Sequence, residues 1–267
     1  MNETSSNPSL IIFTTEFKRL LHSIKFKILL VIMAFPAVIY LLNPQPQGTG
    51  IEAMRKAFQS LMIDLIPNYW AGIIGQFIII ILMSDLLAGE IDKGTIRLII
   101  SKPVRVSEIL IGKFIAGTSV MCILFLVPYA IIWLYNPVVY HTGISGLTKS
   151  FQDLVLAFAS TLLVLASLGA LTMAISVIVT RPLYASLSTF GIVFLLQFII
   201  PQIPYITHPE RYTLGYQTII LLKSSFDLNQ IAAFKGNPSY TALFFGGVII
   251  LLLVISWVTL SKREFPE

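Results

Sequence analysis

Six long apolar segments dominate the sequence and constrain its fold more than any other feature. A helix needs about 20 predominantly apolar residues to cross the hydrocarbon core of a bilayer. Each segment reaches or approaches that length. The segments are 24–42, 70–87, 114–135, 154–180, 183–200 and 240–260. The sequence therefore predicts an all-α membrane protein with six transmembrane helices, forming a single transmembrane domain over residues 1–267.

Composition supports this class. Hydrophobic residues make up 56% of the chain and charged residues only 12%, whereas a soluble domain carries about a quarter charged residues. Such a chain cannot cover a water-facing surface of ordinary size, so lipid has to cover much of it.

Two of the segments depend on local detail. The first is short if it begins at Ile28, and it reaches full length if it begins near Ile24, with Lys25 and Lys27 extending back to the interface. Arg181 and Pro182 separate the fourth segment from the fifth. Proline favours a helix start and arginine is costly at mid-membrane, so we expect a tight polar turn there.

The distribution of basic residues predicts the orientation. Twelve of the 18 Lys and Arg residues fall on the side of the two termini, and the remaining six lie in the loops 43–69, 136–153 and 201–239. Because cytoplasmic loops carry an excess of Lys and Arg, both termini are expected in the cytoplasm. The three loops are then on the outer side. The first is long enough to hold short helices, and so is 201–239, which we expect to be a lid, a re-entrant element or a folded cap.

An amphipathic pattern precedes the first membrane segment. The apolar residues recur at helical spacing, and polar residues occupy the other faces. We expect a helix lying in the inner interface, with its apolar side in lipid and its basic residues near anionic headgroups. The alternative is a simple N-terminal extension of the first membrane helix. The apolar set is Phe13, Phe17, Leu20, Leu21, Ile24 and Ile28, and the polar set is Glu16, Lys18, Arg19, His22 and Lys25.

Two segments partly match motifs for catalysis or phosphate binding, but each lacks a residue that the motif requires. The segment 143–146 has the GxSG form of an intramembrane serine protease, but none of the three histidines falls in a membrane segment to act as the base. The segment 143–150 lacks the glycine that a phosphate-binding loop places before its lysine. Cys122 is the single cysteine, so no disulfide or thiolate metal site is expected. We predict no catalytic, cofactor or metal site in this chain.

The membrane segments also lack most of the ionisable residues that would couple transport to an ion gradient. The last four contain no Asp, Glu, Lys, Arg or His, although ion-coupled carriers place such residues in the membrane. Gln76 and Gln197 are the strongly polar exceptions, and we expect them to form interhelical hydrogen bonds or to line a substrate path. Small residues in the fourth segment indicate close helix packing. They are Ala159, Ala166, Ser167, Gly169, Ala170 and Ala174.

The most informative stretch is the loop 89–113, between the second and third segments. It holds eight charged residues but also a run of apolar ones, and Gly94 and Pro103 interrupt it. This pattern predicts a short, stiff element with an apolar and a charged side. It is typical either of a docking site for another protein or of an interfacial loop.

Residues of this loop resemble the corresponding loop of ATP-binding-cassette (ABC) type 2 permeases, the membrane subunits of ABC exporters. The similarity lies in Glu90, Gly94-Thr95, Ser101-x-Pro103-x-Arg105 and Gly112-Lys113, and it extends to the six-segment topology. The resemblance implies the six-helix type 2 exporter bundle, with a cytoplasmic coupling helix between the second and third spans that rests on a separate ATPase subunit. It also implies a second permease subunit, identical or homologous, and ATP and Mg²⁺ bound only on the partner.

From this resemblance we expect eight residues to couple the chain to the ATPase. Glu90, Arg97 and Arg105 are expected to make polar contacts, whereas Gly94 and Pro103 shape the element. Thr95, Ser101 and Lys113 complete the set.

The sequence therefore predicts an ABC permease, with a preference for export, in the plasma membrane of a prokaryote. An amphipathic or lipid-like substrate fits the apolar spans better than an ion does, and no nucleic-acid partner is expected. The alternatives are a self-contained channel or carrier and, less favoured, a membrane-embedded enzyme.

Overall fold

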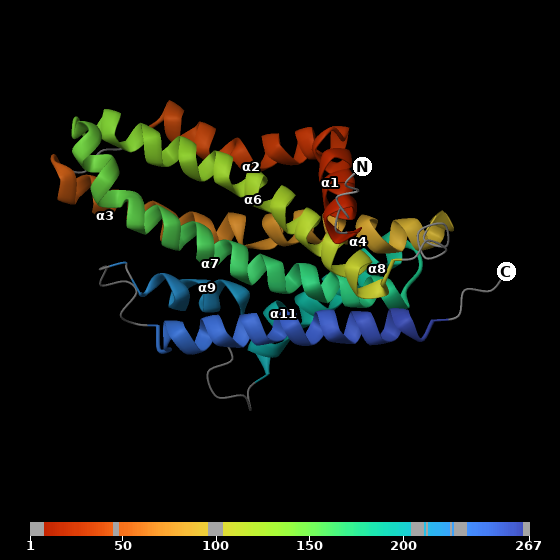
Figure 1. Cartoon of the computed structure of the whole chain (residues 1–267). Coiled ribbons are helices and arrows are strands. Elements are labelled where there is room, and N and C mark those ends of the chain that lie inside the picture. Colours follow the sequence, from red (N-terminus) through yellow and green to blue (C-terminus); the bar gives the residue numbers. More distant parts are fainter. Residues whose placement is uncertain are drawn as a thin grey trace.

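A computed structural model describes residues 8–44, 48–95, 104–203, 211, 213–224, 226 and 234–263. These residues form a bundle of long helices that run roughly along one common direction (Figure 1). The α-helices are α1 (Pro8–Leu21), α2 (Ile24–Leu42), α3 (Ile51–Leu65), α4 (Ile73–Asp92), α6 (Val106–Val139), α7 (Gly143–Ile178), α8 (Pro182–Phe194), α9 (Leu214–Leu222) and α11 (Pro238–Ser261). Shorter helical turns are the π-helices η1 (Ile66–Trp70) and η2 (Leu195–Ile199) and the 3₁₀ turn η3 (Ile200–Gln202).

Within the described residues, six helices are long and apolar enough to cross a membrane. They are α2, α4, α6, α7, α11 and the continuous helical stretch Pro182–Gln202, which contains α8, η2 and η3. The predicted all-helical fold with six membrane helices is confirmed at this level. Successive long helices alternate in direction, so both chain ends lie at the same end of the bundle, here named the terminal end (Figure 1).

Two helices are longer than the apolar segments that predicted them. α6 ends at Val139 and α7 begins at Gly143, so most of the predicted outer loop 136–153 is helical. α6 also begins earlier than its apolar segment, at Val106. A helix satisfies its own backbone hydrogen bonds whether its surroundings are lipid or water. Hydropathy therefore marks the membrane-embedded part of a helix but not its ends.

The first membrane helix begins at the residue expected. Ser23 lies between α1 and α2, and its hydroxyl accepts a hydrogen bond from the backbone N–H of Phe26 at 3.1 Å. A serine cap of this kind satisfies one of the free N–H groups at a helix start. α2 consequently starts at Ile24 as a separate helix, rather than as a continuation of α1.

A proline inside α2 is compensated by side chains from η1. Pro36 has no N–H to donate to the carbonyl of Ile32, four residues earlier. The hydroxyl of Tyr69 donates to that carbonyl at 2.6 Å, and the indole N–H of Trp70 donates to the carbonyl of Met33 at 3.2 Å. These bonds hold α2 against η1.

The centre of the bundle is formed by α4, α6 and α7. In their most apolar windows 72%, 50% and 61% of residues are buried, against 17% in α2, in Pro182–Gln202 and in α11. Met83 of α4 packs where the three central helices meet. A Cβ atom added to Gly117 of α6 would lie 2.7 Å from its Sδ, and one added to Gly169 of α7 would lie 3.1 Å from its Cε. The predicted close packing along α7 is thus confirmed, except that Ala159 is exposed.

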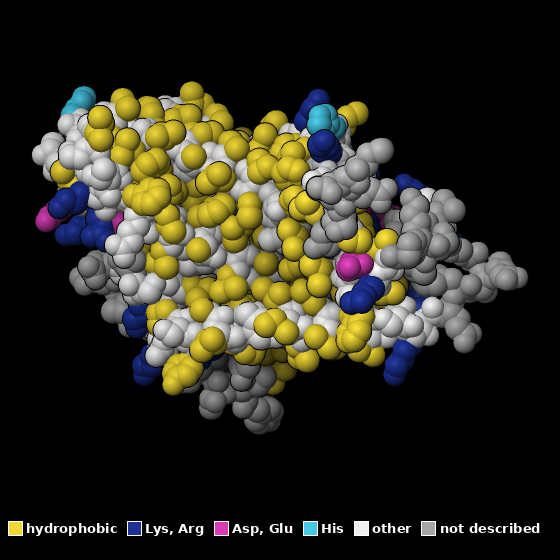
Figure 2. Space-filling model, in the orientation of Figure 1, with side chains coloured by type: hydrophobic (Ala, Val, Ile, Leu, Met, Phe, Trp, Pro, Cys, Tyr) yellow, Lys and Arg dark blue, Asp and Glu magenta, His cyan; other side chains and the backbone are white. Residues whose placement is uncertain are grey.

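The peripheral helices leave an apolar surface. Hydrophobic side chains cover most of the visible middle of the molecule, whereas the coloured charged side chains gather toward its two ends (Figure 2). This is the surface expected of a protein whose middle is surrounded by lipid.

The two long loops that we expect on the outer side both contain helices. The first holds α3, which packs on α7. The second holds α9, which is only nine residues long and lies alongside α7 and α11 (Figure 1). Its last five residues are buried. This helix is too short to cross a bilayer.

Candidate functional site

Four charged side chains meet at the terminal end of the bundle. Glu16 and Arg19 come from α1, Glu90 from the last turns of α4 and Lys113 from α6. Lys113 Nζ lies 2.6 Å from Glu16 Oε1 and 2.7 Å from Glu90 Oε1. Arg19 lies 2.6 Å from Glu16 and 3.4 Å from Glu90. We name these four residues the charged cluster.

A glycine allows α1 to reach this position. Gly112 precedes Lys113 on α6, and a Cβ atom there would lie 3.0 Å from the backbone oxygen of Ser9 and 3.1 Å from a side-chain carbon of Ile12. Ser9, Ile12 and Glu16 follow one another at helical spacing, so they share the side of α1 that packs on α6. The close approach at Gly112 brings Glu16 to Lys113.

The cluster is buried and electrically balanced. Lys113 is completely buried, and Glu16 and Glu90 are each 7% exposed, while the side chain of Arg19 remains half exposed. Removing a charge from water costs several kcal/mol unless opposite charges compensate it. Two carboxylates and two cations provide that compensation, so the three helices are held together through this point.

The cluster also closes the loop 89–113. Glu90 lies at its beginning and Lys113 at its end, and their ion pair joins the two. Just after Glu90, Gly94 adopts the left-handed φ of 69°. Glycine adopts a φ of this sign without the steric penalty that a side chain would bring. Thr95 donates a hydrogen bond to the carbonyl of Glu90 at 3.3 Å, and the backbone N–H of Arg105 donates to the Glu108 carboxylate at 2.9 Å where α6 begins.

The eight residues expected to couple to an ATPase divide into three groups. Gly94, Thr95 and Arg105 are exposed at the terminal end. Glu90 and Lys113 are buried within the chain. Arg97, Ser101 and Pro103 lie outside the described residues.

The position of α1 differs from the expectation. Glu16, which we placed on a polar face, points into the bundle, and Phe17, Leu20 and Leu21 pack against the core, so that side of α1 does not lie in lipid. Leu10 and Ile11 are the exposed large apolar residues of this helix. Lys113 accounts for this position, because its buried ammonium pairs with Glu16 of α1 as well as with Glu90 of α4. A lysine at the start of an apolar segment was the available signal for this partner.

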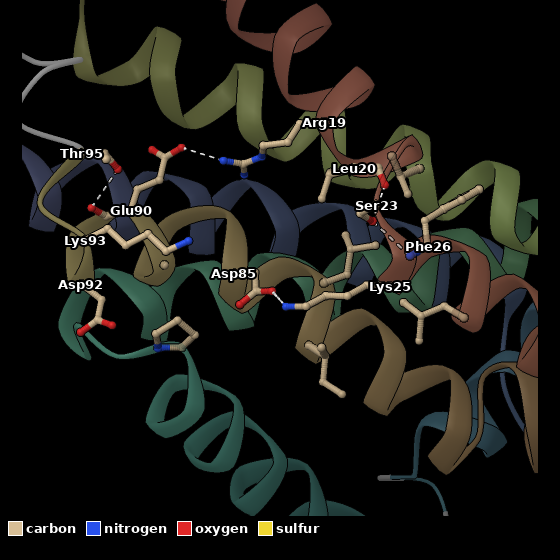
Figure 3. A pocket seen from close by; sticks show the side chains of 16 residues that line it. Arg19, Leu20, Ser23, Lys25, Phe26, Asp85, Glu90, Asp92, Lys93 and Thr95 are labelled. Atoms are coloured by element: carbon tan, nitrogen blue, oxygen red, sulfur yellow. Dashed lines mark hydrogen bonds and ion pairs between the residues drawn. The ribbon is translucent and has the colours of Figure 1, made fainter.

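A cleft opens beside the cluster, between α1, α2 and α4 (Figure 3). Its volume is about 550 Å³, within the range of small-molecule sites. Lys25 of α2 pairs with Asp85 of α4 across it, and Lys93 extends into it (Figure 3). We did not predict a role for Asp85, although an acidic residue inside an apolar segment is itself a signal of function.

Polar side chains also pair within the membrane region. Gln76 and Gln197 exchange two hydrogen bonds, of 3.3 and 2.6 Å, which join α4 to η2. Gln76 also donates to the carbonyl of Ala71 at 2.7 Å. Of the two roles considered for these residues, interhelical hydrogen bonding is confirmed. Across the described part of the chain, no group of three or more His, Cys, Asp or Glu side chains is placed to hold a metal ion.

A model of a known protein family matches almost the whole chain. The family model described as "ABC-2 family transporter protein" matches residues 10–265. No curated protein matches the chain significantly.

Proposed function

Since the chain belongs to the ABC-2 family of transporter membrane proteins, we propose that it is the permease subunit of an ABC exporter. It moves an amphipathic or lipid-like substrate by alternating access, and ATP hydrolysis in a separate nucleotide-binding subunit drives it. The observation that carries this proposal is the charged cluster, which ties both ends of the loop 89–113 to α1.

The cluster supports a mechanical role for the loop. A force applied to the exposed residues Gly94, Thr95 and Arg105 is transmitted to Glu90 and Lys113, because these two residues close the loop. Lys113 also binds Glu16, so α1 moves with the ends of α4 and α6. An ATPase that pulls on the loop would thereby shift three helices together.

This mechanism refines the roles of the expected coupling residues. Thr95 and Arg105 contact the ATPase, and Gly94 shapes the loop. Glu90 and Lys113 act from inside the chain by holding the loop closed. The contacts expected of Arg97, Ser101 and Pro103 stay part of the proposal.

The chain works as one of two permease subunits, identical or homologous. The exposed apolar sides of α2, Pro182–Gln202 and α11 offer surface for such a partner as well as for lipid. Both termini face the cytoplasm of a prokaryotic cell, because the excess of Lys and Arg lies at the terminal end. ATP and Mg²⁺ bind on the ATPase.

Co-purification tests the proposal. The tagged chain is expressed with the ATPase subunit from its own gene neighbourhood, and we expect the two to purify as one complex that hydrolyses ATP in lipid vesicles. A partner whose phosphate-binding lysine is changed to alanine should assemble but not transport. Substrate transport by the purified chain without any ATPase would contradict the proposal and favour a self-contained carrier.

A further inference from the structure

We propose that the cleft between α1, α2 and α4 binds the headgroup of a zwitterionic phospholipid, an amphiphile that carries both an ammonium and a phosphate. The proposal deepens the transport function and rests on it where it names this lipid as cargo. We name the site the inner cleft.

The inner cleft has a polar mouth and an apolar interior. Its charged residues come from the end of α1, the start of α2 and the end of α4 (Figure 3). Further along α2 and α4 the lining becomes apolar, with Phe26 and Leu29 from α2, Ile81 and Leu82 from α4, and Val120 from α6. A molecule with a charged head and hydrocarbon chains matches this division.

The charges of the lining are balanced in sign. Three cations, Arg19, Lys25 and Lys93, face three carboxylates, Asp85, Glu90 and Asp92. A purely anionic head would bring its phosphate close to carboxylates, and a purely cationic one would meet the lysines. A head with both signs can place its ammonium at a carboxylate and its phosphate at an ammonium, which makes two charge-assisted interactions.

Lys25 and Asp85 form an accessible ion pair in the lining. Their side chains are 69% and 36% exposed, so the pair is open to a ligand, unlike the charged cluster. Lys93 extends into the same space (Figure 3). Asp85 is thus the residue we assign to the lipid ammonium, and Lys25 and Lys93 are those we assign to the phosphate.

The depth of Asp85 favours a lipid over a soluble ligand or a protein. Asp85 precedes Glu90 by five residues on one helix, which places it about 7–8 Å further from the terminal end at 1.5 Å per residue. It lies inside an apolar segment. Membrane lipids are the molecules that bring a charged head and hydrocarbon chains to that depth.

Native mass spectrometry of the purified chain tests this site. The protein is offered equal amounts of phosphatidylethanolamine and phosphatidylglycerol with identical acyl chains. We expect retention of phosphatidylethanolamine at least fivefold above phosphatidylglycerol. Asp85→Asn and Lys93→Gln should each lower that retention at least threefold, whereas Lys149→Gln at the opposite end should leave it unchanged. Lys93 is exposed and forms no part of the charged cluster, so Lys93→Gln remains informative if Asp85→Asn fails to fold.

Several results would overturn the assignment. The first is equal retention of the two lipids, and the second is retention at the parental level by both variants. The third is full displacement of the lipid by soluble phosphoethanolamine at the same concentration, because this would show that the binding needs no acyl chain. In vesicles containing the complete transporter, ATP-dependent movement of labelled phosphatidylethanolamine supports the cargo role, and a bound but immobile lipid refutes it. Lipid retention is measured without the ATPase, so its loss is distinguishable from a failure of the chain to assemble with an ATPase.

Discussion

The ammonium of Lys113 lies 2.7 Å from the carboxylate of Glu90, so one buried ion pair joins the two ends of the loop between the second and third membrane helices. The same ammonium lies 2.6 Å from Glu16 on α1. A displacement of the loop is therefore shared by three helices that are distant in sequence.

Replacing Lys113 with methionine should destabilise the chain strongly. The change leaves Glu16 and Glu90 buried, with only the half-exposed Arg19 to compensate them. Breaking a buried ion pair by removing one partner costs about 3–5 kcal/mol. The thermal unfolding midpoint in detergent measures the loss. Lys149→Met, at an exposed lysine of α7, is the matched control and should change the midpoint little.

A compensated variant separates charge from packing. Adding Glu16→Gln and Glu90→Gln to Lys113→Met removes the uncompensated carboxylates, so much of the lost stability should return. If the triple variant is no more stable than Lys113→Met alone, the cost arises from packing and the electrostatic account is wrong.

Gly112→Leu should detach α1 from α6. Even a Cβ atom at this position lies 3.0 Å from the backbone oxygen of Ser9, and a leucine is far larger. We expect backbone amides of α1 to exchange hydrogen at least tenfold faster, which corresponds to about 1.4 kcal/mol. Gly247→Leu on α11, where a Cβ atom meets nothing within 4 Å, is the control. Equal exchange in the two variants would contradict the close contact.

An ion pair at the end of the bundle opposite the two termini should respond asymmetrically to substitution. Arg55 of α3 binds Asp153 of α7 through two hydrogen bonds of 2.6 and 3.0 Å. Asp153 is fully buried, but the side chain of Arg55 is 36% exposed. Arg55→Met removes two charge-assisted hydrogen bonds from a buried carboxylate, whereas Asp153→Asn leaves a cation that can turn toward water. Chemical denaturation should therefore show a larger loss of stability for Arg55→Met, and the reverse order would refute this reasoning.

Hydropathy predicted the membrane helices because lipid imposes a simple requirement on twenty successive residues. The start of α2 at Ile24 was also predictable, since it depends on local chemistry. The ends of two helices could not be predicted in this way. α6 and α7 continue beyond their apolar segments, where composition no longer distinguishes a helix from a loop.

The charged cluster was not predictable from the loop alone. Glu90 and Lys113 were recognised as members of the loop, but their burial depends on α1, whose partner is separated from it by about a hundred residues. Periodicity indicates that a helix has an apolar and a polar side without identifying what each side contacts. Asp85 and Lys25 illustrate the same limit, since only the fold brings them together.

The pair formed by Gln76 and Gln197 should show measurable coupling. Each amide donates to the other, so Gln76→Leu leaves Gln197 without its partner. Interhelical hydrogen bonds in membranes average about 0.6 kcal/mol and reach roughly 1.7. A double-mutant cycle with the two leucine variants should give a coupling energy in that range. Additive effects would show that the hydrogen bonds contribute nothing to stability.

Variants of an exposed and of a buried loop residue should distinguish direct contact with the ATPase from a role in holding the loop closed. Arg105 is exposed, so Arg105→Glu should reduce ATP hydrolysis by the assembled complex several-fold and leave the unfolding midpoint of the chain unchanged. Glu90 is buried against Lys113, so Glu90→Leu should lower both. Lys149→Glu, at the opposite end, controls for charge reversal. If Glu90→Leu reduces hydrolysis without affecting stability, Glu90 contacts the ATPase directly, as the sequence first suggested. If Arg105→Glu hydrolyses ATP at the parental rate, that residue takes no part in coupling.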